Sequence, residues 1–287
     1  MGKLVELKNI SKVYTNKNVL RDISLTIDEG EIIAILGGNG TGKSTILRII
    51  AGLERPSSGK VIYPKKSIRV GYVPERFSKL LRFTPSEYLN YVGKIDGLSK
   101  EYLTKRISYL LNRFQLKELN NQWIMNLSKG NIQKVGIIQA ILQIPELLIL
   151  DEPISGLDLH AQQELLTVLK ELKEQGTTIL LTYHESNIFE SLVEKTYDLN
   201  NGLISKVNSV KIEQEKIKLL EVKQIDDSHV KQWHEVISME KKDNNLLLYV
   251  HLKNSDVILS RILQLKGSIN SVSTIDFDRK INNERDV

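Results

Sequence analysis

The sequence predicts an α/β fold with parallel strands in its larger part and a small α+β domain at its carboxyl end. Short apolar runs alternate with longer stretches of helical period up to about residue 205, and this alternation is typical of a parallel sheet covered by helices. A polar stretch, residues 208–216, is followed by a second group of strand and helix patterns. We therefore expect two domains, 1–207 and 215–287.

The first domain has clear strand and helix patterns. Apolar and β-branched runs predict strands at residues 5–10, 22–27, 32–36, 67–73, 147–150 and 177–181. Helical periodicity predicts helices at residues 42–51, 85–92, 100–114, 128–142 and 159–175. Because residues 76–145 contain no convincing strand, we expect a helical subdomain inserted in the α/β core. Asn201-Gly202 predicts a hairpin between residues 197–199 and 203–207.

The second domain reads as strands and helices in mixed order. Strands are expected at residues 217–222, 245–251 and 271–277, with a further short strand near 237–240, and helices at 228–236 and 256–265. The order is then βαββαβ, which is that of ferredoxin-like domains. The charged tail, residues 278–287, is expected to fray.

Length and composition exclude several classes of protein. The 287 residues contain no Cys, which excludes disulfides, thiol catalysis and zinc–thiolate sites. The excess of 40 Lys+Arg over 35 Asp+Glu gives a net charge of +5, spread along the chain, which is too weak to predict a nucleic-acid partner. No apolar stretch approaches the roughly 20 residues that span a bilayer. The amino terminus has no signal-peptide pattern, so we expect a chain that does not enter a membrane unaided.

A phosphate-binding motif follows the expected strand at residues 32–36. Its sequence, Gly37-Gly38-Asn39-Gly40-Thr41-Gly42-Lys43-Ser44-Thr45, fits G-x-x-x-x-G-K-[ST] with a strand before it and a helix after it. Glycines let successive backbone N–H groups surround a phosphate, and the helix N-terminus attracts the same charge. Lys43 is expected to reach the β- and γ-phosphates, and the Ser44 hydroxyl to bind Mg²⁺. The expected nucleotide contacts are Gly37, Asn39, Gly40, Thr41, Gly42, Lys43, Ser44 and Thr45.

Two adjacent carboxylates follow another apolar strand, residues 147–150. In P-loop enzymes an acidic residue at the end of a neighbouring strand holds the Mg²⁺ that bridges the phosphates, and Asp151 fits this role. Glu152, one residue later, can lean toward the attacking water and orient or deprotonate it. Without the P-loop, two acids after a strand would be interpreted as a solvated turn.

Six short blocks stand in the order and spacing of one known family. They are Val13-Tyr14, Gly71-Tyr72-Val73-Pro74-Glu75, Leu127-Ser128-Lys129-Gly130-Asn131, Asp151-Glu152-Pro153, Ser155-Gly156-Leu157-Asp158 and Thr182-Tyr183-His184. Over about residues 3–205 the sequence resembles the ATP-binding-cassette (ABC) ATPases, whose P-loop NTPase domain carries a helical subdomain. The resemblance implies ATP and Mg²⁺ as cofactors.

The resemblance also implies roles for single residues. Tyr14 corresponds to the aromatic that stacks on adenine, with a core-facing strand residue as the alternative. Ser128 and Gly130 correspond to the signature that binds the γ-phosphate held by a second subunit, so hydrolysis would need a head-to-tail dimer; Ser128 also suits an N-cap. His184 corresponds to a switch histidine that contacts the γ-phosphate and the water. Asp158 corresponds to the loop acid that meets the partner subunit.

The chain departs from the commonest family pattern at three positions. Lys129 and Asn131 stand where Gly and Gln are usual. Glu75 replaces a Gln that senses Mg²⁺ and water. A carboxylate there could still approach Mg²⁺, although it adds negative charge beside Asp151 and Glu152. Gly-Tyr-x-Pro-Glu resembles the cassettes of type-2 exporters.

The function that the resemblance implies is hydrolysis of ATP to drive a separate transmembrane permease, which exports a peptide or a hydrophobic drug. The partners would be that permease and a second cassette, identical or not, and the location would be the cytoplasmic face of the cell membrane. Two alternatives remain: a soluble cassette that acts on ribosomes or DNA, and an importer ATPase. The first is disfavoured because the chain has one cassette and no sustained heptads.

Overall fold

The computed structural model describes residues 2–15, 17–183, 188–207, 216–230, 233, 235–242 and 245–276. It divides into two compact units, Met1–Lys206 and Val207–Val287. His184, for which a catalytic role is expected, lies outside the described residues.

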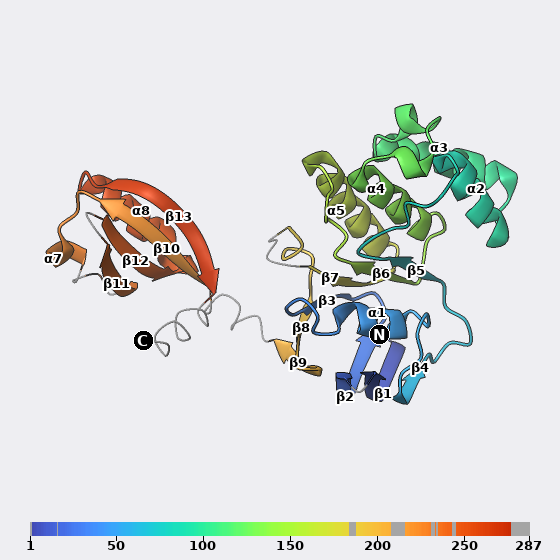
Figure 1. The fold of residues 1–287 in the computed structure, drawn as a ribbon, viewed down its shortest axis with the longest axis horizontal. Helices are drawn as coiled ribbons and strands as arrows, with labels where there is room; N and C mark the ends of the chain where they lie inside the picture. Colours follow the sequence, from blue (N-terminus) through green and yellow to red (C-terminus); the bar gives the residue numbers. More distant parts are fainter. Residues whose placement is uncertain are drawn as a thin grey trace. The chain divides into compact units, whose positions relative to one another are not determined.

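A six-stranded sheet forms the centre of the first unit (Figure 1). Its strand order is β5-β6-β7-β3-β8-β9, and β3 pairs in parallel with both β7 and β8. The strands are β3 (Ile32–Leu36), β5 (Val70–Val73), β6 (Leu147–Asp151), β7 (Thr178–Thr182), β8 (Lys195–Asn200) and β9 (Leu203–Val207). Because β3, β6 and β7 run in parallel, their carboxyl ends meet at one edge of the sheet.

A second, antiparallel sheet belongs to the same unit. It has the order β2-β1-β4 and is built from β1 (Lys3–Tyr14), β2 (Lys17–Asp28) and β4 (Ser58–Ile62). Strand β4 is not among the strands expected from the sequence, because Ser58, Gly59 and Lys60 are exposed and give no apolar signal. Strand β5 starts three residues later than expected, since pairing with β6 begins only at Val70.

Alternating side chains of the central sheet enter two separate cores. Ile33, Ile35, Ile149 and Leu180 pack with α1 (Lys43–Ile50) and with buried residues of β1 and β2. Ile32, Ala34, Leu148, Leu150, Ile179 and Leu181 pack with the helices on the opposite face. A strand buried on both faces loses its alternating pattern, which explains the continuous apolar runs of β3, β6 and β7.

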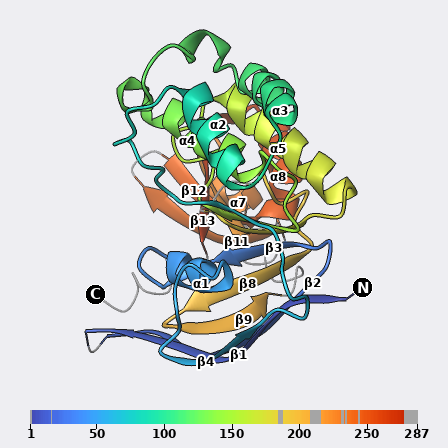
Figure 2. The same ribbon diagram turned by 90° about the vertical axis from the view of Figure 1, so that its right-hand side faces the viewer.

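The helices on that opposite face are α2 (Pro85–Ile95), α3 (Lys100–Arg113), α4 (Lys129–Ala140) and α5 (Leu159–Glu174), with short 3-10 turns at Lys117–Leu119 and Ile124–Asn126 (Figures 1 and 2). Side chains cap their amino ends. Thr84 and Glu87 form a reciprocal capping box on α2, and Ser99 caps α3. Among the residues that the structure describes, no helix has the length and apolar character of a membrane span.

The described residues of the second unit form one sheet and two helices, which pack around a common apolar core. Its elements are β10 (Lys216–Lys223), α7 (Asp227–Val230), β11 (Val236–Lys242), β12 (Asn245–His251), a 3-10 turn at Leu252–Asn254, α8 (Ser255–Gln264) and β13 (Ser268–Asp276). The sheet is antiparallel with the order β11-β12-β10-β13, so the chain passes through strands and helices in the order βαββαβ. Of the helix expected at residues 228–236, the described part is α7, and the helix does not reach residue 236, because Trp233 is not helical and β11 begins at Val236.

Arg113 joins the helical subdomain to α5. Its guanidinium lies 2.7 Å from Glu171 Oε2, and it also donates to Glu164 and to the Tyr109 hydroxyl. The side chain is only 16% exposed. Hydrogen bonds to Glu171 and Glu164 raise the Arg113 pKa against the opposing effect of burial.

We expect Arg113→Ala to lower the free energy of unfolding by about 2 kcal/mol, because it leaves two partly buried carboxylates without their shared cation. Lys105→Ala is the matched control: it removes an ion pair with Glu101 whose lysine is 77% exposed, and should cost about 0.5 kcal/mol or less. Urea denaturation measures both, and equal losses would show that Arg113 contributes no more than a surface pair.

Candidate functional site

Six of the eight predicted phosphate-binding residues line a cleft of 500 Å³, whereas Gly37 and Thr41 are not among its lining residues. Tyr14 and Val19 line the same cleft, as do Glu75 and Glu152. The other lining residues are Asn39, Gly40, Gly42, Lys43, Ser44 and Thr45. Residues from β1, β2, the P-loop and the end of β6 therefore meet at one place.

The P-loop conformation requires glycine. It connects the end of β3 to the start of α1, and Gly37, Gly40 and Gly42 have φ of 145°, 75° and 109°, a region that disfavours other residues. A Cβ on Gly37 would lie 2.4 Å from the Leu199 carbonyl oxygen, so no side chain fits there. Lys43, 5% exposed, donates from Nζ to the carbonyl oxygens of Gly37 and Gly38 at 2.8 and 3.1 Å. Its ammonium thus lies inside the loop.

Asp151 and Glu152 are held by a threonine of the neighbouring strand. Asp151 is 2% exposed, and its Oδ1 accepts a 2.8 Å hydrogen bond from the Thr182 hydroxyl. The same Thr182 oxygen accepts from the Glu152 N–H at 3.0 Å. Glu152 has a φ of 48°, the left-handed region, so the chain turns sharply as it leaves β6. This turn places Glu152 Oε1 3.6 Å from Lys43 Nζ.

The signature block begins α4 and contacts the loop after Glu152. Ser128 caps the helix, since its hydroxyl accepts from the Asn131 N–H. A Cβ on Gly130 would lie 2.3 Å from the Gly156 carbonyl oxygen, so this position needs glycine for packing within the chain. Lys129 Nζ donates to the Ser155 hydroxyl at 3.1 Å.

Asp158 occupies the far end of that loop. It caps α5 by accepting from the Ala161 N–H, and its Oδ2 lies 2.6 Å from Lys134 Nζ. Hydrogen bonds from Lys134 and then from Ala161 lower the Asp158 pKa. Because Lys134 is 3% exposed, this pair fixes the loop to the signature helix.

Glu75 and Tyr14 lie at the rim of the cleft. Glu75 is 43% exposed and forms an ion pair with Arg76 at 3.5 Å. Tyr14 is 39% exposed, and its phenol hydroxyl donates a hydrogen bond to the Glu54 carboxylate. Glu75 and Tyr14 line the same cleft as Lys43; the contacts expected of them, to Mg²⁺ and to adenine, stay predictions.

Several residues that shape the site give no functional signal of their own in the sequence. Val19 lines the cleft from β2, where an apolar residue on a strand carries no chemical signal. Thr182 belongs to the block Thr182-Tyr183-His184, and Lys134 lies in the helix expected at residues 128–142. Neither position by itself indicates a role. Their contacts to Asp151 and Asp158 cross between elements, so only the folded chain reveals them.

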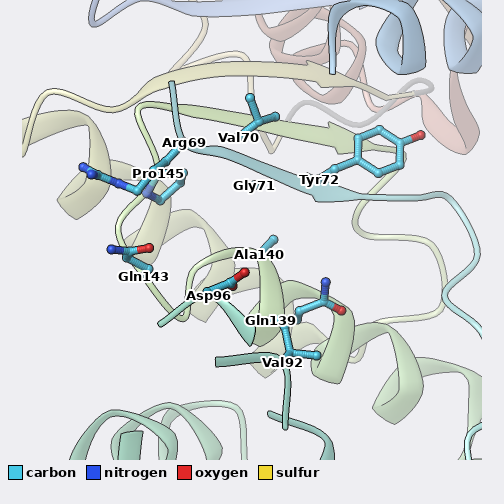
Figure 3. A pocket seen from close by; sticks show the side chains of 10 residues that line it. All are labelled: Arg69, Val70, Gly71, Tyr72, Val92, Asp96, Gln139, Ala140, Gln143 and Pro145. Carbon is cyan, nitrogen blue, oxygen red and sulfur yellow. The ribbon is translucent and has the colours of Figure 1, made fainter. Parts of the chain in front are cut away.

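A second pocket, of 560 Å³, lies between β5 and the helices α2 and α4. Figure 3 shows Asp96 and Gln139 on the helical side, across from Val70 and Gly71 of β5, and Gln143 on the loop near Pro145. None of the sequence-predicted site residues lines it. Among the described residues, the buried side-chain atoms without a hydrogen bond are Glu31 Oε2 and Asn245 Oδ1, and neither belongs to this pocket.

Comparison with known proteins identifies the family. A family model described as ABC transporter matches residues 20–155. An uncharacterized ABC transporter ATP-binding protein of Methanocaldococcus jannaschii is 37% identical over 202 residues, which are 70% of this chain and 76% of the relative. The chain belongs to the ABC transporter ATP-binding proteins. As a member of this family it is an ATPase that binds ATP.

Other members of the ABC family include proteins named as import subunits. The zinc import ATP-binding protein ZnuC of Pasteurella multocida is 38% identical over 64% of this chain and 68% of its own length. The methionine import ATP-binding protein MetN 1 of Enterococcus faecalis is 33% identical over 72% of this chain and 63% of its own length.

Solved structures confirm the predicted fold class of this ABC cassette. An ATP-binding subunit of an ABC transporter, 34% identical, matches with a TM-score of 0.67 over 73% of this chain and 92% of its own. A dimeric cassette in a post-hydrolysis state, bound to ADP and phosphate, is 27% identical and matches with a TM-score of 0.63. The match covers 72% of this chain and 100% of that cassette.

We expect Thr182→Val to lower the free energy of unfolding by about 1–3 kcal/mol, because it leaves the buried Asp151 carboxylate without the hydroxyl donor. ATP hydrolysis should fall as well, since the Glu152 N–H loses its acceptor. Thr182→Ser keeps the hydroxyl and should retain most of both. Denaturation and steady-state ATPase assays check these outcomes, and a Val variant as stable and active as the Ser variant would contradict the positioning role.

Proposed function

We propose that this chain is the nucleotide-hydrolysing subunit of an ABC transporter that works as a dimer of cassettes with a separate permease. The observation that carries the proposal is the meeting of Lys43 and Glu152, 3.6 Å apart, in a cleft that Tyr14 also lines. Phosphate, base and water would each find a suitable side chain in that cleft.

Oxygen donors that suit Mg²⁺ lie in the cleft, at Ser44, and next to it along the chain, at Asp151, which precedes the cleft-lining Glu152. Ser44 supplies a hydroxyl at the start of α1, and Asp151 supplies a carboxylate at the end of β6, and hard oxygen donors are what Mg²⁺ binds. Among the described residues no group of three or more His, Cys, Asp or Glu forms a metal cage, which is compatible with a cation that keeps water and nucleotide oxygens as its other ligands. When bound, the cation would neutralise phosphate charge. Glu75 is a further candidate contact for it.

The hydrolytic roles follow from position and charge. Lys43 and the P-loop N–H groups of Gly40, Thr41 and Gly42 would hold the phosphates in place. Glu152, turned out of β6 by its left-handed backbone, would orient the attacking water and accept its proton. By family resemblance His184 would contact the same water.

The second cassette would complete each site. Ser128 and Gly130 begin α4 at a capped helix N-terminus, where N–H groups attract an anion. We assign this anion as the γ-phosphate bound to the partner's P-loop. The solved cassette that is dimeric with ADP and phosphate bound supports the dimer on which this assignment depends. Asp158 would contact the partner from the adjacent loop.

A groove beside Glu75 suits the permease. Its volume is 730 Å³, and Phe77, Met125, Leu127 and Ile132 give it an apolar lining. Arg76, Lys79 and Lys129 add positive charge. These features favour an amphipathic permease segment with acidic residues, and they would hold the chain at the cytoplasmic face of the membrane.

We propose export as the direction of transport, on the resemblance of Gly71-Tyr72-Val73-Pro74-Glu75 to type-2 exporters, with a peptide or hydrophobic drug as cargo. Import is the second candidate, because relatives such as ZnuC and MetN are named as import subunits.

Glu152→Gln should retain ATP binding and lower kcat about 100-fold or more, because it removes the general base. It should also accumulate an ATP-bound dimer, detectable by size-exclusion chromatography with light scattering. Adding Ser128→Arg to this variant should abolish the dimer while leaving ATP bound to the monomer. Undiminished hydrolysis by Glu152→Gln would remove Glu152 from the proposed role.

The direction can be tested in vesicles that contain the chain together with its permease, with the cassettes facing outward. Export predicts that cargo added on the ATP side stimulates hydrolysis, because an exporter loads from the cassette side. Stimulation only by cargo sealed in the lumen would overturn export in favour of import.

A further inference from the structure

Tyr14, at the end of β1, is surrounded by three charged side chains. Its phenol donates to the Glu54 carboxylate. Lys12 Nζ lies 2.8 Å from Glu54 Oε1, and Arg48 Nε lies 3.0 Å from Glu54 Oε2. Glu54 stands in the loop after α1, so the network joins β1, α1 and that loop.

The carboxylate at the centre of this network stays ionised. Burial opposes its charge, since the side chain is 18% exposed, but hydrogen bonds from Lys12, Tyr14 and Arg48 outweigh burial and lower the Glu54 pKa to about 2. The phenol therefore has a charged acceptor at any physiological pH. Hydrogen bonds to charged acceptors are the stronger kind.

The tyrosine ring also carries a cation on one face. The Lys12 ammonium lies 4.9 Å from the ring centroid and is itself held by the Arg55 carbonyl at 2.7 Å. A cation at this distance attracts the π electrons of the ring. Tyr14 lines the nucleotide cleft, whereas Lys12, Arg48 and Glu54 do not, so the charged partners support the ring from behind the cleft surface.

We propose that Glu54 is a positioning residue for base recognition: with Lys12 and Arg48 it holds the Tyr14 ring in the orientation that stacks on the base of the nucleotide. The inference rests on the proposed function, in which Tyr14 contacts the base. Fixing the ring before binding removes an ordering cost from the binding step. The Lys12 ammonium draws electron density from the ring, which favours stacking of an electron-rich purine on the other face.

A structural role for the network would give a different pattern of binding. The ion pairs join β1 to the loop after α1, so a purely structural loss would weaken every ligand of the cleft. Inorganic tripolyphosphate separates the two cases, because it presents phosphates to the P-loop but has no base. Loss of base recognition should weaken ATP binding and leave tripolyphosphate binding unchanged.

The test is calorimetric titration of ATP and of tripolyphosphate into the wild type, Glu54→Ala and Tyr14→Phe. We expect each substitution to raise the Kd for ATP about fivefold, which corresponds to about 1 kcal/mol, and to change the Kd for tripolyphosphate less than twofold. KM for ATP should rise while kcat stays within twofold. The double variant should lose no more than Glu54→Ala alone, because Glu54→Ala already removes the hydrogen bond that Tyr14→Phe removes.

Glu6→Ala is the matched control. Like Tyr14, Glu6 is on β1. It resembles Glu54 in pairing with two cations, Lys3 and Lys8, at 3.3 and 3.4 Å, yet it does not line the cleft. It should leave both ligands unaffected. If Glu54→Ala fails to fold, Tyr14→Phe still tests the hydrogen bond, because it leaves all the ion pairs of Glu54 in place.

Two results would overturn the inference: an unchanged Kd for ATP in both variants, or an equal loss for ATP and tripolyphosphate. Failure of the proposed function would look different, since the wild type would then bind neither ligand. Tyr14→Ala tests whether Tyr14 contacts the base independently of Glu54. If Tyr14→Ala weakens ATP binding while Glu54→Ala leaves ATP binding unchanged, Tyr14 is retained as the base contact and Glu54 is rejected as its positioning residue.

Discussion

The hydrogen bond from the Thr182 hydroxyl to the Asp151 carboxylate is the contact on which the site depends. Asp151 ends a strand that is buried along its whole length, and a carboxylate there needs a donor to offset the loss of water. Thr182 supplies it from β7, and the same oxygen receives the Glu152 N–H. One side chain thus fixes both the buried acid and the backbone turn that aims Glu152 at Lys43. Register between β6 and β7 pairs Asp151 with Thr182 directly, so a shift of the pairing would separate them.

A second set of contacts joins the loop after Glu152 to the signature helix. Gly130 packs on the Gly156 carbonyl, Lys129 donates to Ser155, and the buried Lys134 binds Asp158. Residues proposed to act on a partner's nucleotide are therefore connected, within one chain, to the loop that follows Glu152, the proposed general base. Movement of either segment would be passed to the other through these contacts, because each contact is direct and short.

Local signals were sufficient where function requires a residue type at a fixed spacing. The P-loop glycines, Lys43 and Ser44 are consecutive, and the apolar runs of β3, β6 and β7 follow from burial on both faces. The exposed strand β4 and the contacts between different elements could not be predicted from such local signals. Strand β4 is largely exposed and gives no periodic apolar signal, and the partners of Tyr14 are 2, 34 and 40 residues away from it along the chain.

The sequence by itself determined the fold class and the nucleotide motif, because both depend on spacing along the chain: strand before loop, helix after it, acids at the end of a buried strand. Tertiary structure alone decided which side chains support those motifs. The supporting contacts join different elements of the fold. They are the hydrogen bonds of Thr182 to Asp151, of Lys134 to Asp158 and of Tyr14 to Glu54, and the ion pairs of Glu54 with Lys12 and Arg48. Ion pairs and hydrogen bonds form between groups that lie close together in the folded chain. Residues far apart in the sequence can form them, so the sequence pattern alone does not predict these partners.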